Sequence, residues 1–258
     1  MSTTVSAASA RGLTVQREQR ERLFYLIAGL AMIIGVAAGF HMFYLHGRND
    51  AGEPVTQQIA PLVYVHAAFM TCWMVLFLLQ CGLVMKGNRR LHMRVGKAAV
   101  VLYAVIIPIG VITALLQIRY ADPGSFPPFG PYRFLTLPLA EIANFTFFVG
   151  VAFLFRRRPE VHRPFMMMGT LSVAEAGMGR IGYIRNAFFQ SSHAAFFPTF
   201  WGSTVTVALV LWLVKFAMTR RLDRHFSTAL ALFVASGLLS SYVSTTAWWF
   251  QLAQRMTH

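Results

Sequence analysis

The sequence predicts an all-α membrane protein built as a bundle of seven transmembrane helices. Of its 258 residues, 56% are hydrophobic and only 12% are charged, about half the charged fraction of a typical soluble domain. Apolar runs of the roughly 20 residues that a helix needs to cross a bilayer recur along the chain. Short arginine clusters separate alternate runs, which is the charge pattern of loops on the cytoplasmic side of a membrane.

Seven runs meet this description, and the first is a retained helix because it exceeds the roughly 7–15 residues of a signal-peptide core. The predicted spans are residues 23–45, 60–85, 91–117, 134–155, 161–183, 201–218 and 226–252. The fifth is the most polar, since it contains Glu175 and Arg180. We expect a basic cytoplasmic arm at residues 1–22, one transmembrane domain at residues 23–252 and a short outer tail at residues 253–258.

The formal net charge of +14 is concentrated on one side of the predicted membrane. That side carries the arginines of the N-terminal arm and the clusters at residues 89–90, 156–158 and 220–221. The positive-inside rule places it in the cytoplasm of a bacterial inner membrane, so the N-terminus lies inside and the C-terminus lies in the periplasm. This distribution argues against a nucleic-acid partner, and it makes the lipid bilayer the expected partner.

After the first span, the chain is predicted to form three hairpins, each of which turns through an arginine cluster. The second helix of each hairpin begins with a histidine, namely His92, His162 or His225. The positive end of the helix dipole disfavours protonation there and leaves a neutral imidazole that is competent as a ligand. These histidines form a predicted secondary inner site; alternatively, they are ordinary interfacial residues that follow a basic loop.

Ionisable groups inside a span are costly and therefore mark candidate functional residues. Here they are His41, His66, Glu141, Glu175 and Arg180. The histidines and the carboxylates each lie four to eight residues from the outer end of their span, so their depths agree within about 6 Å. Asn144 shares the helix face of Glu141, which it follows by three residues. Together these side chains predict a cofactor-binding pocket in the outer leaflet.

The composition of this pocket leaves several functions open. The two histidines and the two carboxylates are an adequate ligand set for a transition metal. His41 and His66 alone suit the axial positions of haem b, with a redox role in electron transport. Glu141 and Glu175 instead suit the proton relay or cation site of a proton-coupled transporter or channel. As a purely structural alternative, either carboxylate pairs with Arg180.

A non-enzymatic role is a further alternative. The basic arm would then dock to another subunit of a larger membrane complex or to anionic lipid, and the protein would act as an accessory or assembly subunit. The chain has no nucleotide-binding or hydrolase motif, so the sequence does not indicate the nucleotide or hydrolase chemistry of soluble enzymes.

Two motifs resemble a family of bacterial multi-pass membrane proteins that is known only as a domain of unknown function. The first, HRPFMMMGTLSVAEAGMGR, begins at His162 and resembles the HRxxM…R helix of that family; the second, HMRVGK, begins at His92 and resembles its HRxLGR motif. The resemblance covers roughly residues 60 to 185 and departs at Met93 and Lys97, where the family tends to have arginine. The resemblance implies a helical membrane fold. The family is also loosely similar to the cytochrome b-type four-helix bundles, in which histidines on facing helices ligate haem.

Overall fold

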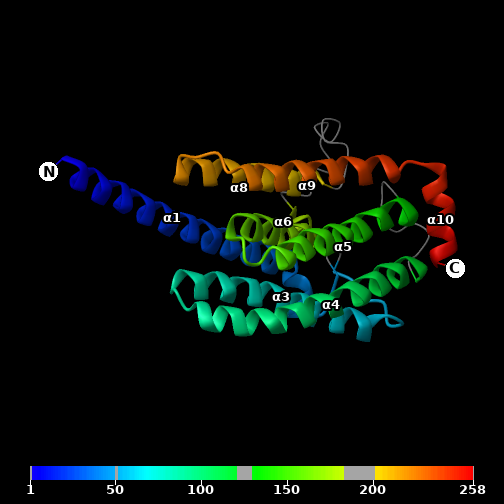
Figure 1. Cartoon of the computed structure of the whole chain (residues 1–258). Helices are drawn as coiled ribbons and strands as arrows, with labels where there is room; N and C mark the ends of the chain where they lie inside the picture. The colour runs from blue at the N-terminus through cyan, green and yellow to red at the C-terminus, as the bar shows by residue number, and fades with distance from the viewer. Residues whose placement is uncertain (1, 50–51, 121–129, 183–200, 258) are drawn as a thin grey trace.

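The computed structural model describes residues 2–49, 52–120, 130–182 and 201–257, and of residues 2–11, 13 and 14 it describes the backbone alone. Nearly all of this part of the chain is helical (Figure 1). The helices are α1 (Ser2–Gly39), α2 (His41–His46), α3 (Ala60–Met85), α4 (Arg89–Arg119), α5 (Pro131–Leu154), α6 (Pro159–Met178), α8 (Gly202–Thr219), α9 (Arg224–Val243) and α10 (Ala247–Thr257).

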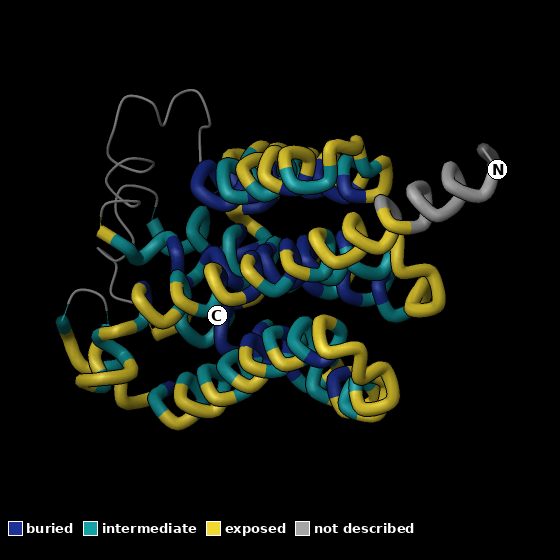
Figure 2. The backbone as a smooth tube through the Cα atoms, turned by 90° about the vertical axis from the view of Figure 1, so that its left-hand side faces the viewer, coloured by how far each residue is buried: buried dark blue, intermediate teal, exposed yellow. Residues whose placement is uncertain are grey.

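The long helices run side by side as three hairpins, as the sequence predicts. The α5–α6 hairpin lies between the α3–α4 hairpin and the α8–α9 hairpin (Figure 1). Helix α1 packs against α3, α6 and α8, so it joins the three hairpins into one bundle. Viewed nearly along the helices, the buried backbone positions lie where the hairpins face one another and the exposed positions cover the outside (Figure 2).

The arginine-rich turns of the hairpins are closed by local backbone chemistry. Gly87 adopts a left-handed φ of 71° after α3, and the side chain of Asn88 then accepts a hydrogen bond from the backbone N–H of Leu91, which starts α4. Between α8 and α9, Arg220 takes the left-handed conformation and Asp223 caps α9. We call the end of the bundle that carries these turns the inner end, and the opposite end the outer end.

Six of the seven predicted spans are confirmed as helices long and apolar enough to cross a membrane, among the residues that the structure describes. They are α1 from Val15, α3, α4, α5, α8 and α9. The chain is therefore an all-helical, multi-pass membrane protein. Helix α6, the predicted fifth span, is too polar to meet this criterion. Its neighbours α1, α5, α8 and α9 surround it, so protein rather than lipid is its environment.

Two predicted spans end earlier than the sequence indicates. The first span was expected to reach residue 45, but α1 stops at Gly39 and α2 follows as a separate short helix. The seventh was expected to reach residue 252, but α9 ends at Val243. The hydroxyls of Ser244 and Thr246 there donate to carbonyls three residues earlier and compete with the continuing helix.

Helix α10 replaces both the end of the predicted seventh span and the predicted outer tail. It turns away from α9 and lies across the outer ends of α4 and α5 (Figure 1). The indole N–H of Trp249 donates to the backbone carbonyl of Tyr132 at 2.9 Å. Ala253, also on α10, is fully buried among residues of α4 and α5. Trp248 and Phe250 point outward, which suits the headgroup region of a bilayer.

Helices α1 and α6 approach so closely that only glycine fits between them. A Cβ atom on Gly39 would overlap the backbone of Gly177, and a Cβ on Gly177 would lie 2.7 Å from the Cα of Val36. Backbone atoms cannot rotate aside as a side chain does. This crossing therefore fixes the outer part of α1 against α6, where the polar residues of α6 lie.

Replacing Gly177 with alanine is expected to lower stability by about 1–3 kcal/mol, the typical cost of overpacking a close contact. Gly82→Ala is the matched control, because a Cβ there meets nothing within 4 Å and alanine favours a helix. Thermal unfolding in detergent, followed by tryptophan fluorescence, should show a lower midpoint for G177A and an unchanged or higher one for G82A. Equal midpoints for G177A and the parent protein would contradict the close crossing.

Candidate functional site

Buried polar side chains of α5, α6, α8 and α9 meet inside the outer half of the bundle. We call this group the outer polar layer. Its members are Glu141, Asn144, Ser172, Glu175, Ser203, Thr204 and Ser236. Because lipid offers these groups no hydrogen bonds, the neighbouring helices must supply their partners. The number of hydrogen bonds that each group forms distinguishes the groups that stabilise the fold from those that are candidates for a function.

Glu175 is the best satisfied member of the layer. Its side chain is 2% exposed, and both of its carboxylate oxygens accept hydrogen bonds from α8. The hydroxyl of Ser203 donates to Oε1 at 2.6 Å, and the hydroxyl of Thr204 donates to Oε2. Ser203 and Thr204 belong to the first turn of α8, where the helix dipole is positive. The two hydroxyl donors and the helix dipole therefore favour the carboxylate form of Glu175, which its burial opposes.

Glu141 has contrasting surroundings. It is 7% exposed, and its buried Oε1 atom has no hydrogen-bond partner in the described structure. Its backbone carbonyl accepts a 3.4 Å bond from the Ser172 hydroxyl, but its carboxyl group interacts with Glu175 and Arg180 only through charge. A buried carboxylate without donors, beside a second carboxylate, is strongly disfavoured relative to the protonated acid.

Asn144 lies one helical turn from Glu141 and is also only partly satisfied. The Ser236 hydroxyl donates to its Oδ1 at 2.6 Å, which ties α5 to α9. Its Nδ2 atom is buried and has no partner among the described residues. Two unpartnered polar atoms thus occur on one face of α5. Each needs a water, a proton or a bound ligand to offset the cost of its burial.

Arg180 lies just beyond the end of α6 and does not form the close ion pair that sequence reasoning allowed. It makes no contact within 4.0 Å with a described carboxylate. Its guanidinium instead donates to the carbonyl of Ala176 and stacks 4.7 Å from the ring centroid of Phe40. Its charge still acts on Glu141 and Glu175 from a longer distance.

The two outer histidines lie apart from the carboxylates. His41 is exposed at the start of α2, and its Nδ1–H donates to the carbonyl of Ala38 at 2.8 Å. His66 is half-buried on α3, and its ring lies against Gly110 of α4. Among the described residues, no group of three or more His, Cys, Asp or Glu side chains is placed to hold a metal ion. The four-ligand metal set therefore does not gather, and haem ligation by His41 and His66 stays a prediction.

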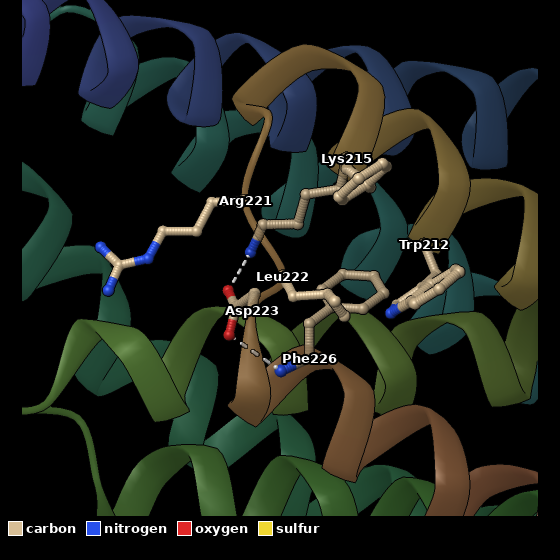
Figure 3. Close-up of a pocket in the computed structure, with 7 residues that line it drawn as sticks. Trp212, Lys215, Arg221, Leu222, Asp223 and Phe226 are labelled. Atoms are coloured by element: carbon tan, nitrogen blue, oxygen red, sulfur yellow. Dashed lines mark hydrogen bonds and ion pairs between the residues drawn. The ribbon is translucent and has the colours of Figure 1, made fainter.

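A second buried polar group, absent from the sequence predictions, lies at the inner end. We call it the inner charged network; its members are Glu21, Tyr25, Arg163, Lys215 and Asp223. Lys215 is only 3% exposed and is at its centre. Its ammonium group donates to the Tyr25 hydroxyl at 3.0 Å, lies 3.3 Å from Glu21 and bonds Asp223 (Figure 3). Arg163 pairs with the other oxygen of Glu21 at 3.4 Å.

Aromatic rings enclose the ammonium group of Lys215. It lies 5.1 Å from the ring centroid of Tyr25 and 4.9 Å from that of Phe226, within the range of cation–π attraction. In the small pocket between α8 and α9, Lys215 points toward Asp223, whereas Arg221 points away from it (Figure 3). The network thus contains two cations and two anions, so its net charge is zero.

Asp223 combines a charge in this network with the N-cap of α9. Burial alone would raise the pKa of its carboxyl group. The hydrogen bond and charge of Lys215, with the backbone N–H groups of Phe226 and His225, outweigh burial and lower the pKa below its ordinary 3.8. The Asp223 carboxylate therefore stabilises the folded protein.

The three inner histidines do not form one site. His162 is half-buried, and its Nδ1–H donates to the carbonyl of Ala152 at 2.8 Å. His92 lies near enough to His162 for their charges to interact, and its buried Nδ1 has no described partner. His225 is exposed, and only its backbone N–H takes part in the cap of α9.

The residues that sequence reasoning missed carry detectable signals. Lys215 is the only charged residue in the predicted span 201–218, and such a charge near the end of a span is ordinarily assigned to snorkelling toward the interface. Ser203 and Thr204 open that span, yet small hydroxyl residues are common in membrane helices. Their hydrogen bonds to Glu175 are evident only from the packing of α8 against α6.

No protein-family model, curated protein or solved structure matches this chain. The resemblance to the family with the HRxxM…R helix therefore stays a prediction, and the function must be inferred from the geometry.

Asp223→Asn tests the inner charged network, because asparagine keeps the N-cap but removes the charge. We expect a loss of about 1.5–3 kcal/mol at neutral pH, the typical value of a hydrogen bond to a charged group. Since the folded-state pKa of Asp223 is lowered, its stabilisation is present above the unfolded pKa and is lost as pH falls through the folded pKa. Unfolding midpoints between roughly pH 6 and pH 3 should fall less steeply in D223N. An equally steep fall in both proteins would refute this role.

Proposed function

We propose that this protein is a proton-coupled transporter of the bacterial inner membrane and that Glu141 and Glu175 form its proton-binding site. In this proposal α6 also crosses the membrane, which brings the number of spans to seven, and the N-terminus is cytoplasmic and the C-terminus periplasmic. The observation that carries it is the unpartnered carboxyl oxygen of Glu141, buried beside Glu175 in the outer polar layer. Buried carboxyl groups within a membrane span commonly belong to proton relays.

The different surroundings of the two carboxyl groups support an exchangeable proton. Glu175 receives two hydroxyl donors and faces the N-terminus of α8, so it holds the negative charge. The buried Oε1 atom of Glu141 receives no donor, and Glu175 repels a charge on Glu141, so Glu141 holds the proton. A pair of acids with such unequal environments has defined donor and acceptor roles, which is the usual arrangement at sites that transfer protons.

An apolar core separates this layer from the inner end, which favours a transporter over an open channel. Met167, Met168 and Leu171 of α6 are fully buried below Glu175, and Phe148 and Phe233 of the neighbouring helices pack around them. Such side chains offer no hydrogen bonds to a moving proton or ion. Passage to the inner side therefore requires the helices to rearrange, as in alternating access.

Glu141→Gln tests the assigned protonation state without knowledge of the substrate. Infrared spectra of the purified protein at neutral pH should contain the band of a protonated carboxyl group, and E141Q should lose it. Glu175→Gln removes a carboxylate rather than an acid, so it should not remove this band. A protonated-carboxyl band that survives in E141Q would refute the assignment.

The transport step needs a separate measurement. Proteoliposomes that enclose a pH-sensitive dye should take up protons under an imposed potential or substrate gradient, and E141Q should abolish this uptake. Glu160→Gln is the control, since Glu160 is exposed in the first turn of α6. The redox alternative gives a distinct result in the same sample: a Soret absorption band that His66→Ala removes would favour haem binding instead.

The N-terminal arm favours the accessory-subunit alternative as a second candidate function. The first turns of α1 extend beyond the inner ends of the other helices (Figure 1). Arg17 and Arg20, in the first half of α1, are exposed. Loss of a co-purifying membrane complex on removal of residues 2–20 would support this role, and a solitary protein with unchanged properties would count against it.

A further inference from the structure

The outer polar layer and the inner charged network connect the same helices at two depths. On α6, Glu175 follows Arg163 by 12 residues, about 18 Å of helix. On α8, Lys215 follows Ser203 by 12 residues, so the two levels are matched on neighbouring helices. Between them lies the apolar core, with Ala208 of α8 and Leu171 of α6 fully buried. The α8–α9 hairpin is therefore attached to the rest of the bundle by polar contacts at both ends.

The α8–α9 hairpin forms polar contacts within itself and separate polar contacts with α1. Lys215 bonds Asp223 within the hairpin, and the Trp212 indole N–H donates to the Ser227 hydroxyl at 2.9 Å. At the inner end, the polar contacts from the hairpin to α1 come from Lys215, which reaches Glu21 and Tyr25. One buried ammonium group thus holds the inner end of the hairpin against α1.

The distribution of charge makes this contact separable. If the hairpin moves away from α1, Lys215 keeps Asp223 and Glu21 keeps Arg163. Both sides then remain neutral pairs, so no buried charge loses its only partner. Breaking a buried ion pair usually costs several kcal/mol because one charge is left unpaired, and this arrangement avoids that cost. The shared Glu21–Lys215 contact is therefore the ionic contact of the network that can break while both partners keep another ion pair.

We infer that the inner charged network is a closed inner gate, and that it opens when the α8–α9 hairpin separates from α1 at the Glu21–Lys215 and Tyr25–Lys215 contacts. This inference rests on the proposed transport function, because a gate is needed where the path from the outer polar layer would reach the inner side. The outer contacts of Ser203 and Thr204 with Glu175 act as the pivot. Opening exposes the α8 surface near Ala208 to the inner side.

Cysteine accessibility tests the gate without any transport measurement. In full-length protein with Cys72 and Cys81 replaced by alanine, Ala208→Cys places one thiol in the apolar core. Inside-out vesicles then receive a membrane-impermeant thiol reagent at the arginine-rich side. Glu21→Gln should raise the labelling rate about tenfold, since it removes a hydrogen bond between charged groups. In this variant Lys215 keeps Asp223, and Arg163, which loses its ion pair, is 27% exposed and can be solvated, so we expect the fold to be preserved.

Glu18→Gln is the matched control. Glu18 lies on the same helix and pairs with Arg22, but it is 68% exposed and does not touch the hairpin. Its labelling rate should equal that of the parent. Tyr25→Phe provides a second variant of similar shape, which removes the 3.0 Å contact with Lys215 and should raise labelling by a smaller factor.

Three results would overturn the gate: unchanged labelling in both E21Q and Y25F, an equal increase in E18Q, or an increase only from the opposite side of the membrane. These results differ from a failure of the proposed function. If Glu141 carries no proton, the infrared band is absent, but labelling still reports whether the inner end opens.

Discussion

Polar groups inside a bilayer must find their partners within the protein, and α6 is the helix on which this constraint falls most heavily. It carries Glu175, Ser172 and Arg163. By composition, it is the one long helix of the described structure that is not apolar enough to cross a membrane. Four neighbouring helices surround it and separate it from lipid. The arrangement of the three hairpins around α1 and α6 satisfies this requirement.

The same constraint accounts for the two polar levels. Each buried charged group lies where a partner on another helix can reach it: Glu175 at the first turn of α8, and Lys215 between α1 and the cap of α9. The apolar core between the levels contributes packing but no hydrogen bonds. This core lies between the carboxyl pair at the outer end of the bundle and the ion pairs at the inner end.

Much of the fold is predictable from the sequence because lipid enforces long apolar runs. The predicted span at residues 60–85 coincides with α3, and the three hairpins are as expected. The early ends of α1 and α9 were not predictable: α1 ends where it crosses α6 at Gly39, and α9 ends where hydroxyl groups after Val243 bond backbone carbonyls. Both regions remain apolar, so composition alone does not show where the helix stops.

For the site, the sequence indicated that Glu141 and Glu175 belong together, but it did not show in which direction each side chain points. Sequence reasoning placed His41 at the level of the carboxylates, yet a helix position also has an angle around the axis, and His41 faces outward. Lys215 was missed because its partner Tyr25 lies 190 residues away in the chain. Such a network is recognised by the balance of its positive and negative charges, and these charges come from several separate segments of the chain.

The glycine crossing between α1 and α6 also has a mechanical consequence. With no side chain between the two backbones, α1 cannot slide or tilt freely at Gly39, so that point acts as a fulcrum. Glu21 lies 18 residues away, about 27 Å along the same helix. A rotation of a few degrees about the fulcrum displaces the far end by more than an ångström while leaving the carboxyl pair almost still. Helix α1 therefore acts as a lever that is held at its outer end, where it meets α6, and that has one long arm reaching the ion pairs at the inner end.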